Sequence, residues 1–123
     1  MHSQLSKNEK AKFEKEYTMC KVLAQNGYKI EALKERPGFS SSDITINGIM
    51  AELKKTSSHN NIIKYAKKAI DIQGSKTVVF EFEEMTHSIQ KELYKLQILG
   101  IHIKYFTTKG KVVMDLSEIQ RPE

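Results

Sequence analysis

The segment DITINGIMAELK, residues 43–54, decides the fold expected of this chain. Asn47 and Gly48 are a strong signal for a two-residue hairpin turn, because both residue types tolerate positive φ. The residues on either side alternate between apolar and polar, as strands with one buried face do. We therefore expect residues 43–46 and 49–54 to pair as an antiparallel hairpin.

This pairing places two acids opposite each other. With Asn47-Gly48 as the loop, Ile46 faces Ile49 and Asp43 faces Glu52. Period-2 alternation then gives one apolar face, formed by Ile44, Ile46, Ile49, Ala51 and Leu53. Asp43, Glu52 and Lys54 share the opposite face. Carboxylates opposed in this way repel each other unless a cation lies between them.

A divalent cation would reverse that repulsion. Asp43 and Glu52, with the backbone carbonyl of Leu53 and water, make a hard oxygen site suited to Mg²⁺ or Mn²⁺, with Zn²⁺ as a further candidate. Lys54 would stabilise the charge that develops on a phosphate. The alternative is an ordinary surface strand on which Lys54 neutralises the two acids.

The flanking segments predict the rest of the fold. We expect helices over residues 7–26, 57–72 and 86–99, and further strands over residues 28–34, 77–82, 101–106 and 111–114. The order α-β-β-β-α-β-α-β-β predicts a mixed α/β sheet with helices on its faces. We expect one domain over residues 9–119, between a flexible segment at 1–8 and a tail at 120–123.

The first helix carries an acid on its predicted apolar stripe. On a helical wheel Glu16 falls inside an apolar stripe, which is formed by Phe13, Tyr17, Cys20, Leu23 and Ala24. An acid on a buried stripe needs a partner or a metal, so Glu16 is a candidate third ligand. The alternative is a glutamate at the edge of the stripe that reaches water.

Charge is distributed unevenly along the chain. The net charge is +5, and residues 1–74 supply all of it with 13 Lys and Arg against 8 Asp and Glu. An excess of positive charge in one part of the chain favours a polyanionic partner, although a solvated lysine-rich surface is the simpler alternative.

No apolar run approaches the roughly 18 residues of a membrane span, so we expect a soluble protein without a membrane partner. The single cysteine, Cys20, leaves no internal disulfide to form.

The spacing Asp43, Glu52-Leu53-Lys54 resembles the signature of the PD-(D/E)XK nuclease superfamily. Ser42-Asp43 stands where that family usually has Pro-Asp. Over residues 17–82 the chain is similar to the C-terminal tRNA-nuclease toxin domains of the CdiA proteins of contact-dependent growth inhibition. The resemblance implies a restriction-endonuclease-like core in the order αβββαβ, here extended by αββ.

Its implications for function are specific. Glu16, Asp43 and Glu52 would hold one or two divalent ions, and Lys54 would be catalytic. A basic residue of the following helix would approach the site, and the candidates are Lys64, Lys67 and Lys68. The substrate would be a nucleic acid, with RNA and above all tRNA favoured over DNA. The chain would act in the cytoplasm as a toxin, delivered as part of a larger secreted or phage-borne protein and neutralised by a cognate immunity protein.

Two other functions fit the same residues. Lys55 and His59, like the helix lysines, are candidate contacts to a nucleic-acid backbone, so the chain could bind nucleic acid without cleaving it. His59 could also act with Lys54 or Thr56 in a metal-independent RNase.

Overall fold

The computed structural model describes residues 7–32, 44–71 and 74–119. Its elements follow the predicted order, and the mixed α/β fold is confirmed. The helices are α1 (Lys7–Gln25), α2 (Ile62–Asp71) and α3 (His87–Ile98), with short 3-10 turns η1 (His59–Asn61) and η2 (Leu116–Glu118). The strands are β1 (Ile30–Ala32), β2 (Ile44–Ile46), β3 (Ile49–Lys55), β4 (Thr77–Phe82), β5 (Ile103–Thr107) and β6 (Met114–Asp115).

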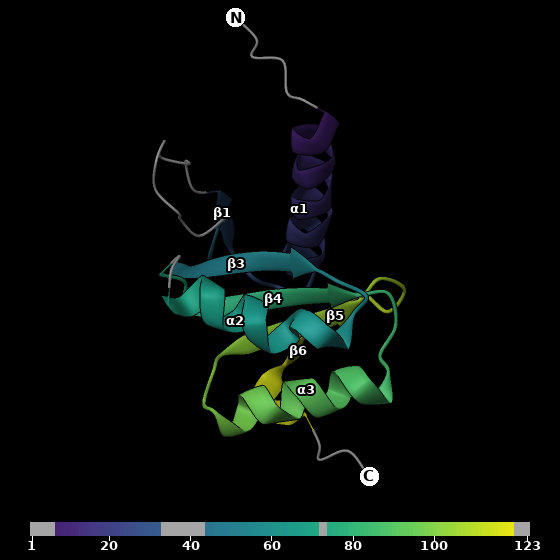
Figure 1. Cartoon of the computed structure of the whole chain (residues 1–123). Coiled ribbons are helices and arrows are strands. Elements are labelled where there is room, and N and C mark those ends of the chain that lie inside the picture. The colour runs from purple at the N-terminus through teal and green to yellow at the C-terminus, as the bar shows by residue number, and fades with distance from the viewer. Residues whose placement is uncertain (1–6, 33–43, 72–73, 120–123) are drawn as a thin grey trace, which may run out of the picture.

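All six strands form one sheet, in the order β1-β2-β3-β4-β5-β6 (Figure 1). The pairs β1–β2, β2–β3 and β5–β6 are antiparallel, whereas β3–β4 and β4–β5 are parallel. Parallel neighbours need a long crossover between them, which α2 and α3 supply. Both crossover helices lie on the same side of the sheet, and α1 lies on the other (Figure 1).

The predicted hairpin register is confirmed. Ile46 pairs with Ile49 and Ile44 with Ala51. Asn47 and Gly48 have φ angles of 50° and 85°, the left-handed conformation that a tight two-residue turn requires. Asp43 lies outside the described residues, so its pairing with Glu52 stays a prediction.

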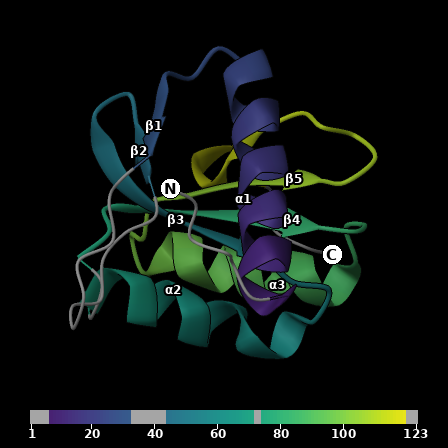
Figure 2. The same cartoon turned by 90° about the horizontal axis from the view of Figure 1, so that it is seen from above.

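Each face of the sheet has its own apolar core. On one face, the α1 residues Met19, Val22 and Leu23 pack on a set of strand residues. These are Ile44, Ile46, Ala51, Leu53, Val79 and Phe106. Figure 2 shows α1 running across the strands on this face. On the other face, α2 and α3 pack on Val78, Phe80, Phe82, Ile103 and Tyr105.

The central strand β4 is buried along its whole length, as its apolar run predicts. Its one charged residue, Glu81, is only 3% exposed. The Thr108 hydroxyl donates to Glu81 Oε2 at 2.7 Å, and Lys55 Nζ lies 3.5 Å from the same oxygen. A buried carboxylate requires such partners, and Lys55 and Thr108 provide a cation and a hydrogen-bond donor.

The buried stripe of α1 differs from the predicted one. Leu23 and Cys20 pack on the sheet as predicted, but Met19 and Val22 join them there, and Tyr17 is 58% exposed. Tyr17 can remain at the surface because its ring lies under Lys21 Nζ, 5.7 Å from the ring centroid. Glu16 is half-buried.

Some element boundaries also differ from the prediction. The last strand begins at Met114, whereas residues 111–114 were predicted. Ser58 caps the 3-10 turn η1, and the α-helix predicted from residue 57 begins only at Ile62. No helix in the described part of the chain has both the length and the apolar character needed to cross a membrane.

Asn26 joins the end of α1 to the loop between β5 and β6. Its Nδ2 donates to the carbonyls of Val22, at 2.7 Å, and Lys111, at 3.0 Å. Its Oδ1 accepts from the Val113 amide at 3.0 Å. One side chain therefore holds two segments that are more than 80 residues apart in the sequence.

We expect Asn26→Ala to lower the free energy of unfolding by about 1 kcal/mol, because these hydrogen bonds are partly exposed and each contributes little. Urea denaturation of the purified protein measures this. Gln25→Ala, at the exposed neighbouring position, is the matched control and should change the free energy by less than about 0.5 kcal/mol. Equal midpoints for the two variants would contradict the bridging role of Asn26.

Candidate functional site

Two of the predicted catalytic residues, Glu52 and Lys54, lie on the face of the sheet that α2 covers. Glu52 pairs in register with Val78 and Lys54 with Phe80, both of which belong to the core under α2 and α3. The residue between them, Leu53, is buried on the α1 face. The sharing of one face by Glu52 and Lys54 therefore follows from the strand period.

Glu52 and Lys54 line a small cavity of about 40 Å³ together with Tyr65, Lys68 and Val78. Glu52 Oε2 is fully buried at this cavity. A volume of this size accepts one or two water molecules, or one group of similar size from a ligand. The cavity therefore combines one buried carboxylate oxygen with two ammonium groups.

Tyr65 holds the head group of Lys54. Lys54 Nζ lies 4.3 Å from the centroid of the Tyr65 ring, within the range of a cation–π interaction. The sequence pattern did not indicate a role for Tyr65 at this cavity. The contact joins β3 to α2, so no local spacing in the sequence indicates it.

The structure separates the three candidate lysines of α2. The buried stripe of the helix is Ile62, Ala66 and Ala69. Lys68 reaches the cavity, whereas Lys64 and Lys67 are exposed and do not line it. Among the predicted helix contacts, Lys68 is thus the one that lies beside Glu52 and Lys54.

Lys55 and His59 lie apart from this cavity. Lys55 follows Lys54 directly, so its side chain projects to the opposite face, where it pairs with Glu81. His59 is exposed in η1 and does not line the cavity. Their predicted contacts to nucleic acid stay predictions.

The predicted metal ligands are only partly described. Glu52 offers a hard oxygen donor, but Asp43 lies outside the described residues and Glu16 belongs to the helix on the other face. Within the described ranges, no group of three or more His, Cys, Asp and Glu side chains could hold a metal ion. With two lysines beside it, Glu52 fits a divalent cation only if a further carboxylate, such as Asp43, joins it.

Comparison with known proteins finds a similar solved structure but no matching family or curated protein. No protein-family model matches the chain, and no curated protein matches it. Among solved structures, the chain is similar to one chain of the "CdiA-CT/CdiI toxin and immunity complex from Burkholderia pseudomallei". The TM-score is 0.70 at 15% sequence identity, and the match covers 94% of this chain and 91% of that chain. At this identity the likeness shows a common fold.

Proposed function

We propose that this chain is a metal-dependent nuclease that hydrolyses phosphodiester bonds, with RNA, and tRNA in particular, favoured over DNA. The observation that carries the proposal is the cavity in which the buried Glu52 carboxylate lies with Lys54 and Lys68. A phosphodiester brings an anionic group, which ammonium groups attract, and its hydrolysis adds negative charge in the transition state.

The side chains of the cavity have distinct parts in this reaction. Lys54 stabilises the charge that develops on the phosphate oxygens, because its ammonium is held at the base of the cavity by the Tyr65 ring. Lys68, exposed at the rim, binds the backbone of the substrate. Glu52 supplies the carboxylate that would hold a divalent cation.

The metal would be held by Glu52 together with Asp43, with the Leu53 carbonyl as a further candidate ligand. Mg²⁺ or Mn²⁺ suits these oxygen donors. When bound, the cation would polarise a phosphate oxygen and promote the ionisation of water.

The similar solved structure supports a toxin-like role, since it is a complex of a toxin with its immunity protein. We infer that this chain is an effector domain with a cognate immunity protein of its own. The Glu52-Leu53-Lys54 pattern on the third strand supports the toxin side of such a pair, because it puts an acid and a lysine into one cavity.

Metal binding should be visible as thermal stabilisation. We expect Mn²⁺ to raise the melting temperature of the wild-type protein, because a ligand that binds only the folded state stabilises it by mass action. Glu52→Gln should abolish the response, and Glu83→Gln, at an exposed position after β4, should keep it. A melting temperature that does not move with Mn²⁺ in the wild type would refute the metal site.

Cleavage should depend on Lys54 more than on the neighbouring lysines. We expect Lys54→Ala to lower the single-turnover rate on tRNA by about 100-fold or more, with a modest loss of affinity. Lys68→Ala should weaken binding and reduce its log–log salt slope by roughly 0.7–0.9, the value for one lost phosphate contact. Lys67→Ala is the control on the same helix.

The assay uses tRNA and duplex DNA, each with and without Mg²⁺ or Mn²⁺. Wild-type cleavage of neither substrate, with binding retained, would leave a nucleic-acid-binding module. Cleavage that persists in EDTA would favour the metal-independent alternative with His59. A wild-type rate for Lys54→Ala would make Lys54 a surface lysine.

Tyr65 should act through its ring. We expect Tyr65→Phe to keep the single-turnover rate, because the ring that faces Lys54 remains. Tyr65→Leu removes the ring but keeps an apolar side chain, and should lower that rate roughly tenfold, as expected for loss of a cation–π contact. Equal rates for the two variants would show that the ring does not position Lys54.

A further inference from the structure

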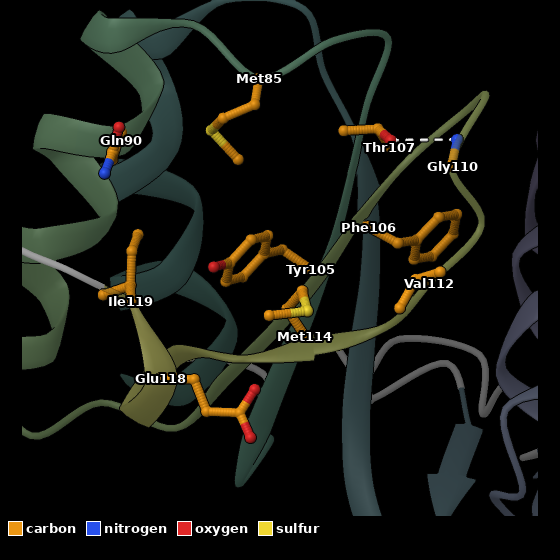
Figure 3. Close-up of a pocket in the computed structure, with 10 residues that line it drawn as sticks. All are labelled: Met85, Gln90, Tyr105, Phe106, Thr107, Gly110, Val112, Met114, Glu118 and Ile119. Atoms are coloured by element: carbon orange, nitrogen blue, oxygen red, sulfur yellow. Dashed lines mark hydrogen bonds between the residues drawn. The ribbon is translucent and has the colours of Figure 1, made fainter.

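A second cavity, of about 420 Å³, lies between the start of α3 and the strands β5 and β6 (Figure 3). Its size falls within the range of sites for small organic molecules. The lining includes Met85, Gln90, Tyr105, Met114, Glu118 and Ile119. The loop after β5 closes one side, where the Gly110 amide donates to Thr107 Oγ1 at 3.1 Å (Figure 3). None of these residues takes part in the proposed nuclease chemistry.

The polar centre of this cavity is the hydroxyl of Tyr105. Tyr105 is only 8% exposed, yet its hydroxyl points into the hollow, on the side of Gln90 and Ile119 (Figure 3). Within the described residues no group forms a hydrogen bond with this hydroxyl. The hydroxyl itself is accessible from the cavity, so a polar group that enters can reach it.

The charges near Tyr105 limit which ligands the cavity can bind. Burial raises the pKa of Tyr105, and the nearby carboxylates of Glu118 and Asp115 raise it further. The phenol therefore keeps its proton at neutral pH and is available as a hydrogen-bond donor. Glu118 lines the cavity and its carboxylate disfavours an anion there, whereas Asp115 is paired with Lys104 at 3.1 Å.

The side chains that line the cavity favour a ligand with a flat apolar ring. The thioethers of Met85 and Met114 lie on opposite sides of the Tyr105 ring in Figure 3, and methionine adapts its shape to aromatic surfaces. Gln90 adds a polar side chain to the wall, and the phenol can both donate and accept a hydrogen bond. An uncharged heterocycle with donors and acceptors on its edge matches this combination.

We propose that the cavity binds an uncharged nitrogen heterocycle the size of a nucleobase, with its ring against Met85 and Met114 and an acceptor at the Tyr105 hydroxyl. The source of the base rests on the proposed function, in which the substrate is a nucleic acid. Nucleobases present adjacent donors and acceptors on their edges. The sugar and the phosphates would remain outside, away from Glu118.

Methionine methyl groups give a direct test. The chain has five methionines, and with ¹³C-labelled methyl groups each reports on its own surroundings by NMR. Titration with adenosine, guanosine, cytidine or uridine should shift the Met85 and Met114 signals for at least one nucleoside. Two other methionines serve as controls, and their signals should not move: Met19, which is buried where α1 packs on the sheet, and Met50, near the start of β3. Met→Leu variants assign the signals.

Tyr105→Phe removes the hydroxyl and keeps the ring. We expect it to weaken nucleoside binding about three- to tenfold, the usual effect of losing one neutral hydrogen bond. Tyr94→Phe is the matched control, because Tyr94 packs against the α2–α3 core and does not line this cavity. Ribose 5-phosphate should leave the Met85 and Met114 signals in place.

Three results would overturn the inference: unmoved Met85 and Met114 signals at millimolar nucleoside, equal shifts with ribose 5-phosphate, or unchanged affinity in Tyr105→Phe. The outcome is separate from that of the nuclease assay. Nucleoside binding without cleavage would refute the proposed function and keep the heterocycle site. Cleavage without nucleoside-induced shifts would refute the heterocycle site alone.

Discussion

The parallel pairing of β3 with β4 is the constraint on which the rest of this structure depends. Because β4 is buried on both faces, β3 beside it must present Leu53 to the core under α1 and Glu52 and Lys54 to α2. A register shift by one residue would exchange these faces and place Glu52 and Lys54 in the apolar core under α1. The cost of burying two charged groups there excludes that arrangement. The position of the candidate site is therefore set by the packing of the central strand.

The same alternation gives two adjacent lysines different surroundings. Lys54 lies against the Tyr65 ring beside a buried carboxylate oxygen, and Lys55 pairs with Glu81 on the other face. Lys55 is engaged in neutralising a carboxylate that is 3% exposed, so its removal would leave a buried charge without its cation. A loss of function in a Lys55 variant would need a stability measurement before it could be assigned to nucleic-acid binding.

The two cavities differ in the charge that they accept. The cavity of Glu52 is lined by Lys54 and Lys68, whose charge favours an anionic group, whereas that of Tyr105 is lined by Glu118, whose charge disfavours one. If the proposed function holds, this difference suits a nucleic acid, which carries both an anionic backbone and uncharged bases. This division is consistent with the charge of the chain, in which residues 75–123 contain equal numbers of acidic and basic residues.

Local pattern alone determined the element order, the hairpin register and the common face of Glu52 and Lys54. Turn residues such as Asn47-Gly48 and a period of two act over a few residues, so the sequence contains them in full. Only the tertiary structure decided that Tyr17 stays at the surface, that Tyr65 lies against Lys54, that Lys55 pairs with Glu81, and that Tyr105 points into a cavity. These features depend on how three helices pack on the sheet. Contacts between residues distant along the chain leave no periodic signal in the sequence, and packing energy selects them.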